Sequence, residues 1–309
     1  MRTFFKTYFP LFFSFLHQNK ESYYSFLGHY FPEKLIRDWY KIVFHKDINL
    51  EKPQNICEKI AWMKLHADMK PWTRCADKYE VRKYVEEKGL GFTLNELYGI
   101  YENAMEIDFD KLPEQFVLKT NNGGGGNNVI IVKSKASLDT KKAVRQLNEW
   151  LKQEVGYRWV EPHYRDVKPL IIAEKYLQPE SGESSLLDYK FYCFDGKVHS
   201  VFFCSDREFG ASVHYSTYSL EWQYQPEKTL PKYRTDKTYP KPKSLDKMIE
   251  YSSILSRGIP FVRMDWYEID DEPVFGEMTF TPGGGFMNFH SMDYLEELGT
   301  QLTLPQAIR

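Results

Sequence analysis

Hydrophobic residues recur along the chain with two different periods, one typical of helices and the other of strands. Residues 20–90 carry many charges, and apolar residues recur among them at helical spacing, as at Ile56, Ile60 and Met63, which indicates helices with one buried face. The segment Asp77–Gly89 repeats this pattern and ends on glycine, a common helix terminator. We therefore predict a helical layer over residues 20–90, with the charges of Asp77–Gly89 mostly on a solvated face.

After residue 90 the pattern changes to short apolar segments separated by turn residues. Residues 91–101 read as a short strand-like segment, Phe116–Lys119 and Val129–Val132 as strands, and PLIIAEKYL, residues 169–177, as a buried strand. Between the last two, Ser137 is placed to cap a helix that runs to about residue 155. This part of the chain therefore reads as four short strands, with one helix before the last of them.

Two strand pairs further on are predicted to form hairpins. DYKFYCF and KVHSVFF flank Asp195-Gly196, a two-residue sequence typical of a tight turn. VRMDWYEI and PVFGEMT flank an acidic turn, and a turn centred on Asp271 would place Asp265 directly opposite Glu277. A helix over residues 245–255 precedes this second hairpin, and a closing helix near residues 292–298 follows it.

Composition and charge exclude several classes of protein. The chain has 309 residues, 42% of them hydrophobic, so it is long enough for two or three compact units with real cores. A net charge of −2 argues against a protein that holds nucleic acid mainly through its phosphates. The four cysteines show no CxxC spacing, so we predict neither a zinc knuckle nor a disulfide framework, and we expect reduced thiols and a cytoplasmic protein.

The first twenty residues are strongly apolar and rich in aromatic residues. They include Lys6 and Pro10 and lack a small-residue cleavage site, so they resemble neither a signal peptide nor a membrane span. Two interpretations remain open: a helix that docks on the domain or on a partner, and a segment that lies on a membrane surface. Residues 1–16 are accordingly a candidate contact with a membrane or a biosynthetic complex.

The acidic hairpin carries the first candidate chemistry. Opposed side chains on paired strands have Cβ atoms about 4.5–5.5 Å apart, so Asp265 and Glu277 repel each other unless one takes up a proton or a cation lies between them. Arg263, two residues before Asp265, suggests that an anionic ligand also binds. A surface acidic cluster without function remains the alternative.

Two further segments offer groups that suit a nucleotide. Lys119 is followed by four glycines between two asparagine pairs, which is either a lid that binds phosphate through its backbone N–H groups or a hairpin tip without function. It is not a P-loop, because the GK[ST] sequence is missing. The end of the 169–177 strand, EKYL, offers backbone groups to the edge of a base, with Lys175 as a second base or phosphate contact, or is simply a strand that reaches solvent.

Two other segments can each be interpreted as part of a binding site or as a feature without function. Asp188 and Lys190 project to one face of their strand, where they would bind ribose and phosphate or form an exposed ion pair. Residues 223–243 contain four prolines and six lysines or arginines, which fits either a clamp for an acidic substrate or a linker.

In this order, the Lys119 and glycine segment, EKYL, DYKFYCFDGK, VRMDWYE and GEMTFTPGGGF resemble the ATP-grasp superfamily, and in particular its TupA-like branch, which is linked to bacterial surface-polysaccharide and teichuronopeptide biosynthesis. The resemblance starts near residue 49 and includes NICEKIAWMKL and DKYEVRKYV. It implies an α+β ATP-grasp fold in which two α+β subdomains enclose ATP after an N-terminal helical region. The implied divisions are 1–48 (aromatic-rich helical segment), 49–114 (helical region), 115–178 (lid subdomain) and 179–309 (subdomain with the metal hairpin).

The resemblance also implies roles for individual residues. It suggests that Lys190 and Arg263 face the phosphates as catalytic residues. In the superfamily an Asn often lies two residues after the second metal carboxylate, whereas this chain has Thr279, so the number of metal ions is left open. The implied metal ligands are Asp265, Glu277 and Thr279, and the implied nucleotide-binding residues are Lys119, Gly123, Gly124, Gly125, Gly126, Glu174, Lys175, Tyr176, Leu177, Asp188 and Lys190.

These expectations favour an ATP- and Mg²⁺-dependent carboxylate–amine ligase that acts through an acyl phosphate. The resemblance implies a small-molecule or glycan-linked carboxylate and amine as substrates, with an amino acid or amine joined to a sugar acid during capsule or envelope polysaccharide synthesis. Three alternatives remain: a sugar kinase on the same scaffold, a sugar-nucleotide glycosyltransferase of a polysaccharide locus, and a non-catalytic assembly factor that binds ATP or glycan.

Overall fold

The computed structural model describes residues 21–124, 128–179, 185–205, 214–235 and 237–308. Residues 21–30 are helical, and a layer of helices follows them, as predicted for residues 20–90. The α-helices are α3 (Pro32–Phe44), α4 (Ile56–His66), α5 (Lys70–Ala76), α6 (Glu80–Glu87), α7 (Thr140–Trp150), α8 (Pro162–Arg165), α9 (Leu245–Ser256) and α10 (Met292–Gln301).

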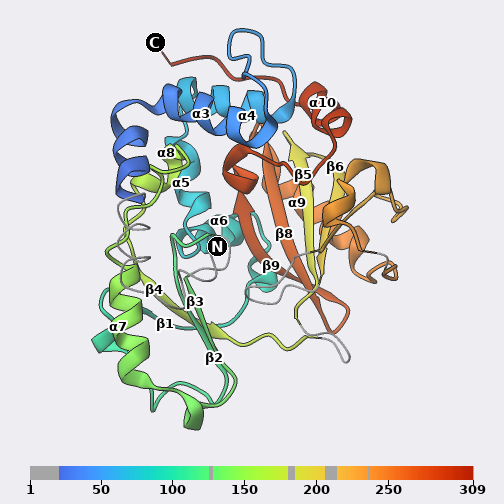
Figure 1. The fold of residues 1–309 in the computed structure, drawn as a ribbon. Helices are drawn as coiled ribbons and strands as arrows, with labels where there is room; N and C mark the ends of the chain where they lie inside the picture. Colours follow the sequence, from blue (N-terminus) through green and yellow to red (C-terminus); the bar gives the residue numbers. More distant parts are fainter. Residues whose placement is uncertain (1–20, 125–127, 180–184, 206–213, 236, 309) are drawn as a thin grey trace.

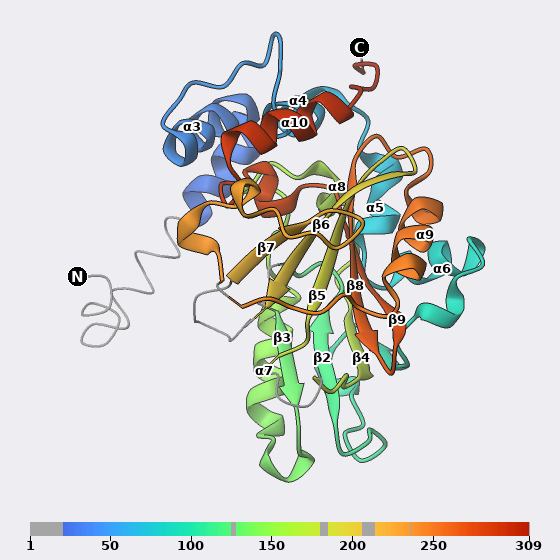
Figure 2. The ribbon, with the colours of Figure 1, turned by 90° about the vertical axis from the view of Figure 1, so that its right-hand side faces the viewer.

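Nine described strands form two antiparallel sheets (Figures 1 and 2). The first sheet has the order β1-β4-β2-β3 and the second the order β7-β6-β5-β8-β9. The strands are β1 (Leu97–Tyr101), β2 (Phe116–Thr120), β3 (Val129–Val132), β4 (Ile171–Lys175), β5 (Asp188–Phe194), β6 (Lys197–Ser205), β7 (His214–Tyr218), β8 (Val262–Ile269) and β9 (Glu272–Thr279).

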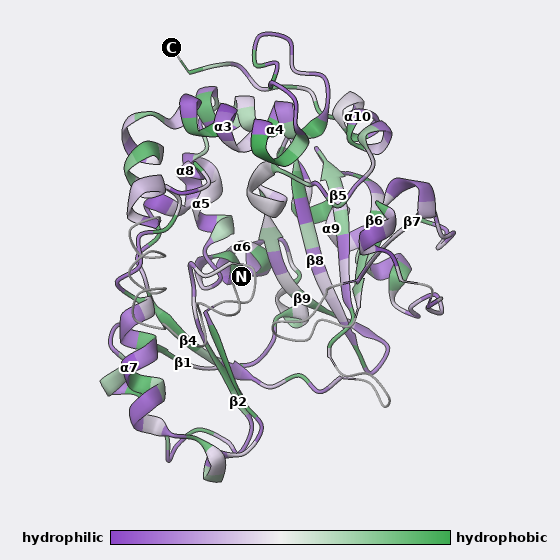
Figure 3. Ribbon diagram, in the orientation of Figure 1, coloured by the Kyte–Doolittle hydropathy of each residue, from purple (hydrophilic) through white to green (hydrophobic). Residues whose placement is uncertain are grey.

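Each sheet has its own hydrophobic core. The four-stranded sheet packs through residues such as Phe116 and Leu118 against Leu147 of α7. The larger core joins the five-stranded sheet to the helical layer and includes Trp266, whose indole donates to Ser252 Oγ of α9 (2.8 Å). In Figure 3, β8 carries both hydrophobic and hydrophilic bands, as expected of a strand with one face on the core. The structure is therefore α+β, as predicted.

Local sequence signals explain several of these elements. Asn55 and Glu58 form a capping box at the start of α4, in which each side chain accepts from the other residue's backbone N–H. The turn between β5 and β6 has positive φ at Asp195 (45°) and Gly196 (81°), the conformation that a two-residue hairpin with the twist of its strands requires. The predicted hairpin at Asp195-Gly196 is confirmed.

The hairpin of β8 and β9 reaches the predicted pairing by a different route. Its turn consists of Asp270 and Asp271, both with positive φ, so Ile269 pairs with Glu272. Simple counting from that turn would pair Asp265 with Gly276. A β-bulge at Gly276 adds one residue to β9, so Asp265 lies opposite Glu277. The pairing is confirmed, but a bulge produces it rather than a turn centred on Asp271.

Some boundaries differ from the prediction. Asp139, not Ser137, caps α7 by accepting from the backbone N–H of Lys142, because Ser137 is the last residue of a short 3₁₀ turn (Lys135–Ser137). The helix ends at Trp150 rather than near residue 155. Strand β1 begins only at Leu97, after a 3₁₀ turn over Gly91–Thr93, and β7 had no counterpart in the prediction.

The proline-rich segment 223–243 is anchored to the body of the protein at its described residues. Thr229 forms a bridge with His290, and Lys228 pairs with Glu297 (2.8 Å). These contacts argue against a simple linker. No helix among the described residues has both the length and the apolar run needed to cross a bilayer.

Candidate nucleotide-binding site

A cavity of about 680 Å³ lies between the two sheets, within the range of small-molecule sites. Both sheets contribute to its walls. Val117 and Ile131 of the four-stranded sheet supply apolar surface, as does Phe275 of the five-stranded sheet. Polar residues from β2, β4, β5, β8 and β9, and from the region of α6, also line the cavity. An apolar slot with a polar end suits a base joined to phosphates.

The predicted base-binding segment lies at this cavity. Glu174, Lys175, Tyr176 and Leu177 all line it. The Lys175 backbone is already engaged, because its N–H donates to the Glu96 carbonyl (2.9 Å) and its carbonyl accepts from the Asn95 side chain (2.9 Å). Tyr176 and Leu177 make no backbone hydrogen bond with the other described residues, so their groups are available to a ligand.

The lysines and glycines of the predicted lid lie near the same cavity. Lys119 lines it and pairs with Glu174 (Nζ–Oε2 2.6 Å). Gly123 also lines it, and a Cβ at Gly124 would meet nothing within 4 Å. Gly125 and Gly126 lie outside the described residues.

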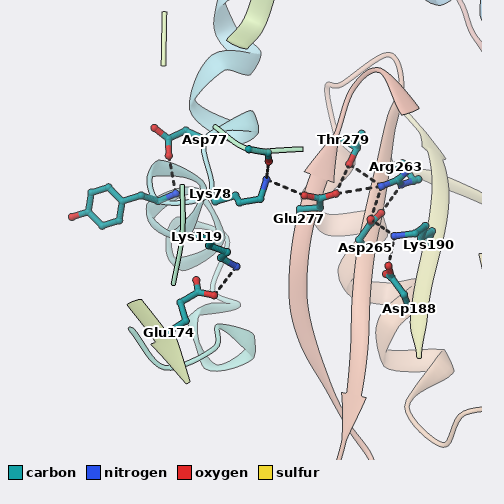
Figure 4. A network of polar contacts seen from close by, with 12 residues as sticks. Asp77, Lys78, Lys119, Glu174, Asp188, Lys190, Arg263, Asp265, Glu277 and Thr279 are labelled. Carbon is teal, nitrogen blue, oxygen red and sulfur yellow. Dashed lines mark hydrogen bonds and ion pairs between the residues drawn. The ribbon is translucent and has the colours of Figure 1, made fainter. Parts of the chain in front are cut away.

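The predicted phosphate and metal residues form two rows across β5, β8 and β9. One row consists of Lys190, Asp265 and Glu277, and the other of Tyr192, Arg263 and Thr279. Since strand neighbours in such rows point to the same face, the charged side chains converge on one patch (Figure 4). Asp188 lies two residues before Lys190 on β5 and joins the patch.

Short contacts connect this patch. Arg263 donates through Nε and Nη2 to both oxygens of Asp265 (2.7 and 2.6 Å), and Nη2 also reaches Glu277 (3.3 Å) and Thr279 (3.1 Å). Lys190 Nζ lies 2.5 Å from carboxylate oxygens of both Asp188 and Asp265. Arg263 Nη1 has no hydrogen-bond partner among the described residues, which leaves it available to an anion.

Burial and neighbouring charge act in opposite directions on these groups. Burial alone would lower the pKa of Lys190, but Asp188 and Asp265 raise it above its ordinary value. Burial would raise the pKa of Glu277, yet the nearby Lys78 and Arg263 hold it well below its usual range. Glu277 is therefore ionised at neutral pH and able to bind a cation.

The donor set fits Mg²⁺ held together with a nucleotide. Two hard carboxylates, Asp265 and Glu277, face one patch, and Mg²⁺ typically binds to one or two carboxylates plus substrate phosphates. No group of three or more His, Cys, Asp or Glu side chains in the described part of the chain forms a self-sufficient metal site. The Thr279 hydroxyl donates to Glu277 (3.2 Å), which orients that carboxylate.

Two cavity residues were missed by the sequence-based prediction. Lys78 Nζ donates to the Gly123 carbonyl (2.6 Å) and lies 3.1 Å from Glu277, so it links the glycine segment to the metal hairpin (Figure 4). Arg82 also lines the cavity. Both belong to DKYEVRKYV, whose charges we predicted to lie mostly on a solvated face, and for these two residues that prediction is wrong.

Most of the predicted site residues are thus brought together. Lys190, Arg263 and Thr279 lie beside the cavity rather than in its wall, and none of the described residues of 223–243 lines it. The predicted site residues that line the cavity are Lys119, Gly123, Glu174, Lys175, Tyr176, Leu177, Asp188, Asp265 and Glu277.

Two α+β units that enclose such a cavity are the arrangement of an ATP-grasp protein. The profile of the TupA-like ATP-grasp family matches residues 58–303, and the chain belongs to that family. A search of the curated proteins finds no match.

Several solved structures of ligases are similar in part. The D-alanine–D-alanine ligase from Bacillus anthracis is 18% identical with a TM-score of 0.42, over 74% of this chain and 67% of that one. N5-carboxyaminoimidazole synthetase from Staphylococcus aureus, complexed with ADP, is 12% identical with a TM-score of 0.44, over 77% and 54%. Phosphoribosylamine–glycine ligase from Thermotoga maritima is 11% identical with a TM-score of 0.44, over 77% and 57%. With TM-scores below 0.5, the assignment rests on the family match.

Proposed function

We propose that this protein is an ATP-dependent ligase that joins a carboxylate to an amine through an acyl phosphate. The observation that carries the proposal is the row of Lys190, Asp265 and Glu277 at the cavity, with Arg263 beside it. Such a row offers both cations for phosphate and carboxylates for a metal. A carboxylate oxygen would attack the γ-phosphorus with ADP leaving, and an amine would then attack the carbonyl carbon with phosphate leaving.

The residues of the patch have definable tasks in this reaction. Two anions must approach each other, so positive charge has to neutralise them in the transition state. Arg263 offers Nη1 to a γ-phosphoryl or carboxylate oxygen, and Lys190 is held rigidly by two carboxylates. Mg²⁺, when bound at Asp265 and Glu277, would supply further charge neutralisation between the phosphates.

Water must be kept from an acyl phosphate, because hydrolysis would waste it. The contact of Lys78 with both Gly123 and Glu277 holds the glycine segment next to the hairpin. A lid anchored in this way supports water exclusion during the reaction.

The substrate half of the proposal is an amino acid or other amine joined to a sugar acid, free or glycan-linked, for capsule or cell-envelope polysaccharide. The family membership supports it. The four cysteines are free and buried, which supports a cytoplasmic location.

An ADP-release screen of uronic acids against amino acids with Mg²⁺, followed by mass spectrometry of the product, tests the proposal. We expect ADP, phosphate and an amide for at least one pair. A phosphorylated sugar without amide would identify a kinase, and glycosyl transfer without ATP would identify a glycosyltransferase; either result would overturn the ligase.

Asp265→Asn tests the site itself. We expect turnover to fall by at least about 100-fold, because a metal carboxylate and an anchor of Arg263 and Lys190 are lost together. Asp271→Asn in the turn of the same hairpin is the matched control. Among the described residues Asp271 forms an ion pair only with the exposed Lys243, and it lies at the far end of the hairpin from the site. Unchanged turnover in Asp265→Asn would place the chemistry elsewhere.

A further inference from the structure

A second polar site begins where β9 leaves the metal patch. Glu277 and Thr279 point to the patch, and Thr281, two residues further on, continues the same alternation. The Thr281 hydroxyl donates to Glu161 Oε1 (2.5 Å). Glu161 comes from the segment between α7 and β4, so a carboxylate from another part of the chain is fixed next to the end of the metal hairpin.

Two polar groups at this place lack partners. Only Oε1 of Glu161 accepts a hydrogen bond from the described residues, so Oε2 has no partner among them, and the Tyr164 hydroxyl also has none among them. Both side chains are half-buried rather than sealed in the core. Polar groups that are deep, unpartnered and still accessible are candidates for contact with a ligand.

Charges of the metal patch reach Tyr164. Burial is the main cause that raises the pKa of this phenol, and the negative charges of Glu161, Glu277 and Asp265 raise it further, whereas Arg263 lowers it. Tyr164 therefore lies within electrostatic range of both Glu161 and the patch.

The backbone around Glu161 is held firmly. Its N–H donates to the Gly156 carbonyl (2.7 Å), and Gly156 has a φ of 87° that favours glycine. A Cβ on Gly284 would lie 3.0 Å from the ring of Trp159, so the glycine turn after β9 packs directly on this segment. A carboxylate supported in this way keeps its position when a substrate binds.

Lys64 does not neutralise Glu161 by direct contact. Its Nζ donates to the Gly284 carbonyl (2.6 Å), and no ion pair between Lys64 and Glu161 occurs among the described residues. Asp265 and Glu277 are paired with Arg263, Lys190 and Lys78, whereas Glu161 Oε2 has no cation in direct contact among the described residues and gives this end of the patch a negative side. Such a side attracts an ammonium group and repels a second carboxylate.

We propose that Glu161 binds the ammonium group of the amine substrate and accepts its proton. This inference rests on the proposed ligase function. The ammonium loses one proton to the Glu161 carboxylate, and the resulting neutral amine attacks the carbonyl carbon of the acyl phosphate. A C–N bond forms, the C–O bond to phosphate breaks, and the departing phosphate takes the second proton from nitrogen and leaves as hydrogen phosphate.

The environment of Glu161 suits that task. Burial raises the pKa of its carboxyl group, with Lys64 and the Thr281 hydroxyl acting in the opposite direction. A raised pKa makes a carboxylate a better proton acceptor near neutral pH. The Thr281 hydroxyl holds Oε1 of Glu161 in place, so Oε2 is the oxygen that would contact the amine.

Hydroxylamine separates the two halves of the reaction, because it is an uncharged nucleophile at neutral pH and needs no base. With ATP, Mg²⁺ and a panel of glucuronate, galacturonate and mannuronate, the wild-type protein should form a hydroxamate with hydroxylamine and an amide with a mixture of proteinogenic amino acids. We expect Glu161→Gln to keep hydroxamate formation within about threefold and to lose amide formation by at least about 100-fold. Glu154→Gln, an exposed carboxylate of the same segment, should change neither.

The other outcomes distinguish failure of the proposed ligase function from failure of the role of Glu161 alone. If the wild-type protein forms no hydroxamate with any uronate, the proposed function fails and this inference fails with it. If Glu161→Gln still forms amide at the wild-type rate, or loses both products equally while folded, only the inference fails. Should Glu161→Gln not fold, Glu161→Asp replaces it: slower amide formation with normal hydroxamate formation supports the proposal, and equal slowing of both overturns it.

Discussion

Cations and carboxylates neutralise each other in the candidate site before a nucleotide binds. Arg263 contacts Asp265 and Glu277, and Lys190 contacts Asp188 and Asp265. A triphosphate that takes over Arg263 would free carboxylate oxygens for a metal ion. The site is therefore organised so that the side-chain ion pairs can be replaced by contacts with the nucleotide and the metal ion, and each buried charge keeps an opposite charge beside it.

The sequence predicted the local part of this site and not the distant part. Alternation along a strand places Arg263 and Asp265 on one face, so short-range periodicity was sufficient for these two residues. Glu277 was also predicted, but the bulge that places it opposite Asp265 was not. Lys78 contacts Gly123, which is 45 residues away in the sequence, and Glu277 on the metal hairpin. A contact of that kind depends on how the two sheets are placed, which no local pattern encodes.

Lys64 provides a prediction about pH. Burial lowers its pKa from 10.5 to about 8, so between these values the unfolded chain binds more protons than the folded one. The free energy of unfolding of the wild-type protein should therefore rise with pH across this window relative to Lys64→Met, by up to about 3 kcal/mol. Urea denaturation of both proteins at pH 7.5 and at higher pH checks this, because it gives the difference in free energy of unfolding between wild type and Lys64→Met at each pH. A difference that stays constant with pH would contradict the prediction.

At the scale of elements, a single residue determines how the metal hairpin is aligned. The bulge at Gly276 brings Glu277 opposite Asp265. Hydrophobic alternation and the acidic turn predicted the hairpin, but neither signals a bulge. Likewise, Asp139 rather than Ser137 caps α7, since a 3₁₀ turn that the pattern does not reveal occupies the preceding residues.

Gly276→Ala tests the bulge. A Cβ at this position would lie 2.8 Å from the Asp265 carbonyl oxygen, so the backbone must shift. We expect the free energy of unfolding to fall by about 1–3 kcal/mol and ADP release to fall with it, as measured by urea denaturation and the ADP assay. Gly124→Ala, where a Cβ meets nothing within 4 Å, should leave stability unchanged. Equal stability of both variants would show that the bulge tolerates a side chain.

At the scale of the whole molecule, the order of motifs predicted the two α+β units but not every strand pairing. Strand β1 joins β4 of the four-stranded sheet although about 70 residues separate them, and β1 lies within the region 49–114. Pairings over such distances are set by the assembled fold. The division into 1–48, 49–114, 115–178 and 179–309 stays a prediction.

An aromatic surface near the N-terminus leads to a further expectation. Tyr23, Phe26, Tyr30 and Phe31 are each more than half exposed and follow directly on the apolar residues 1–20. Because aromatic side chains favour the membrane interface, we propose that this surface contacts a bilayer. The full chain should co-sediment with phosphatidylglycerol vesicles, and replacing Phe26 and Tyr30 by serine should weaken this at least about fivefold.

Phe92→Ser is the matched control, since Phe92 is 70% exposed on a different part of the protein. It should leave vesicle binding unchanged. Absence of vesicle binding by the full chain, or equal binding by all three proteins, would contradict the membrane contact and favour a role in docking to the domain or to a partner.

The most direct test of the ligase proposal follows a carboxylate oxygen. The uronate that supports ADP release is prepared with ¹⁸O in its carboxylate and incubated with the protein, ATP, Mg²⁺ and the amine. If an acyl phosphate forms, the attacking oxygen stays with phosphorus when the amine displaces phosphate, so mass spectrometry should show one ¹⁸O atom in the released phosphate. Phosphate that carries no ¹⁸O, formed at the same rate as the product, would contradict the mechanism.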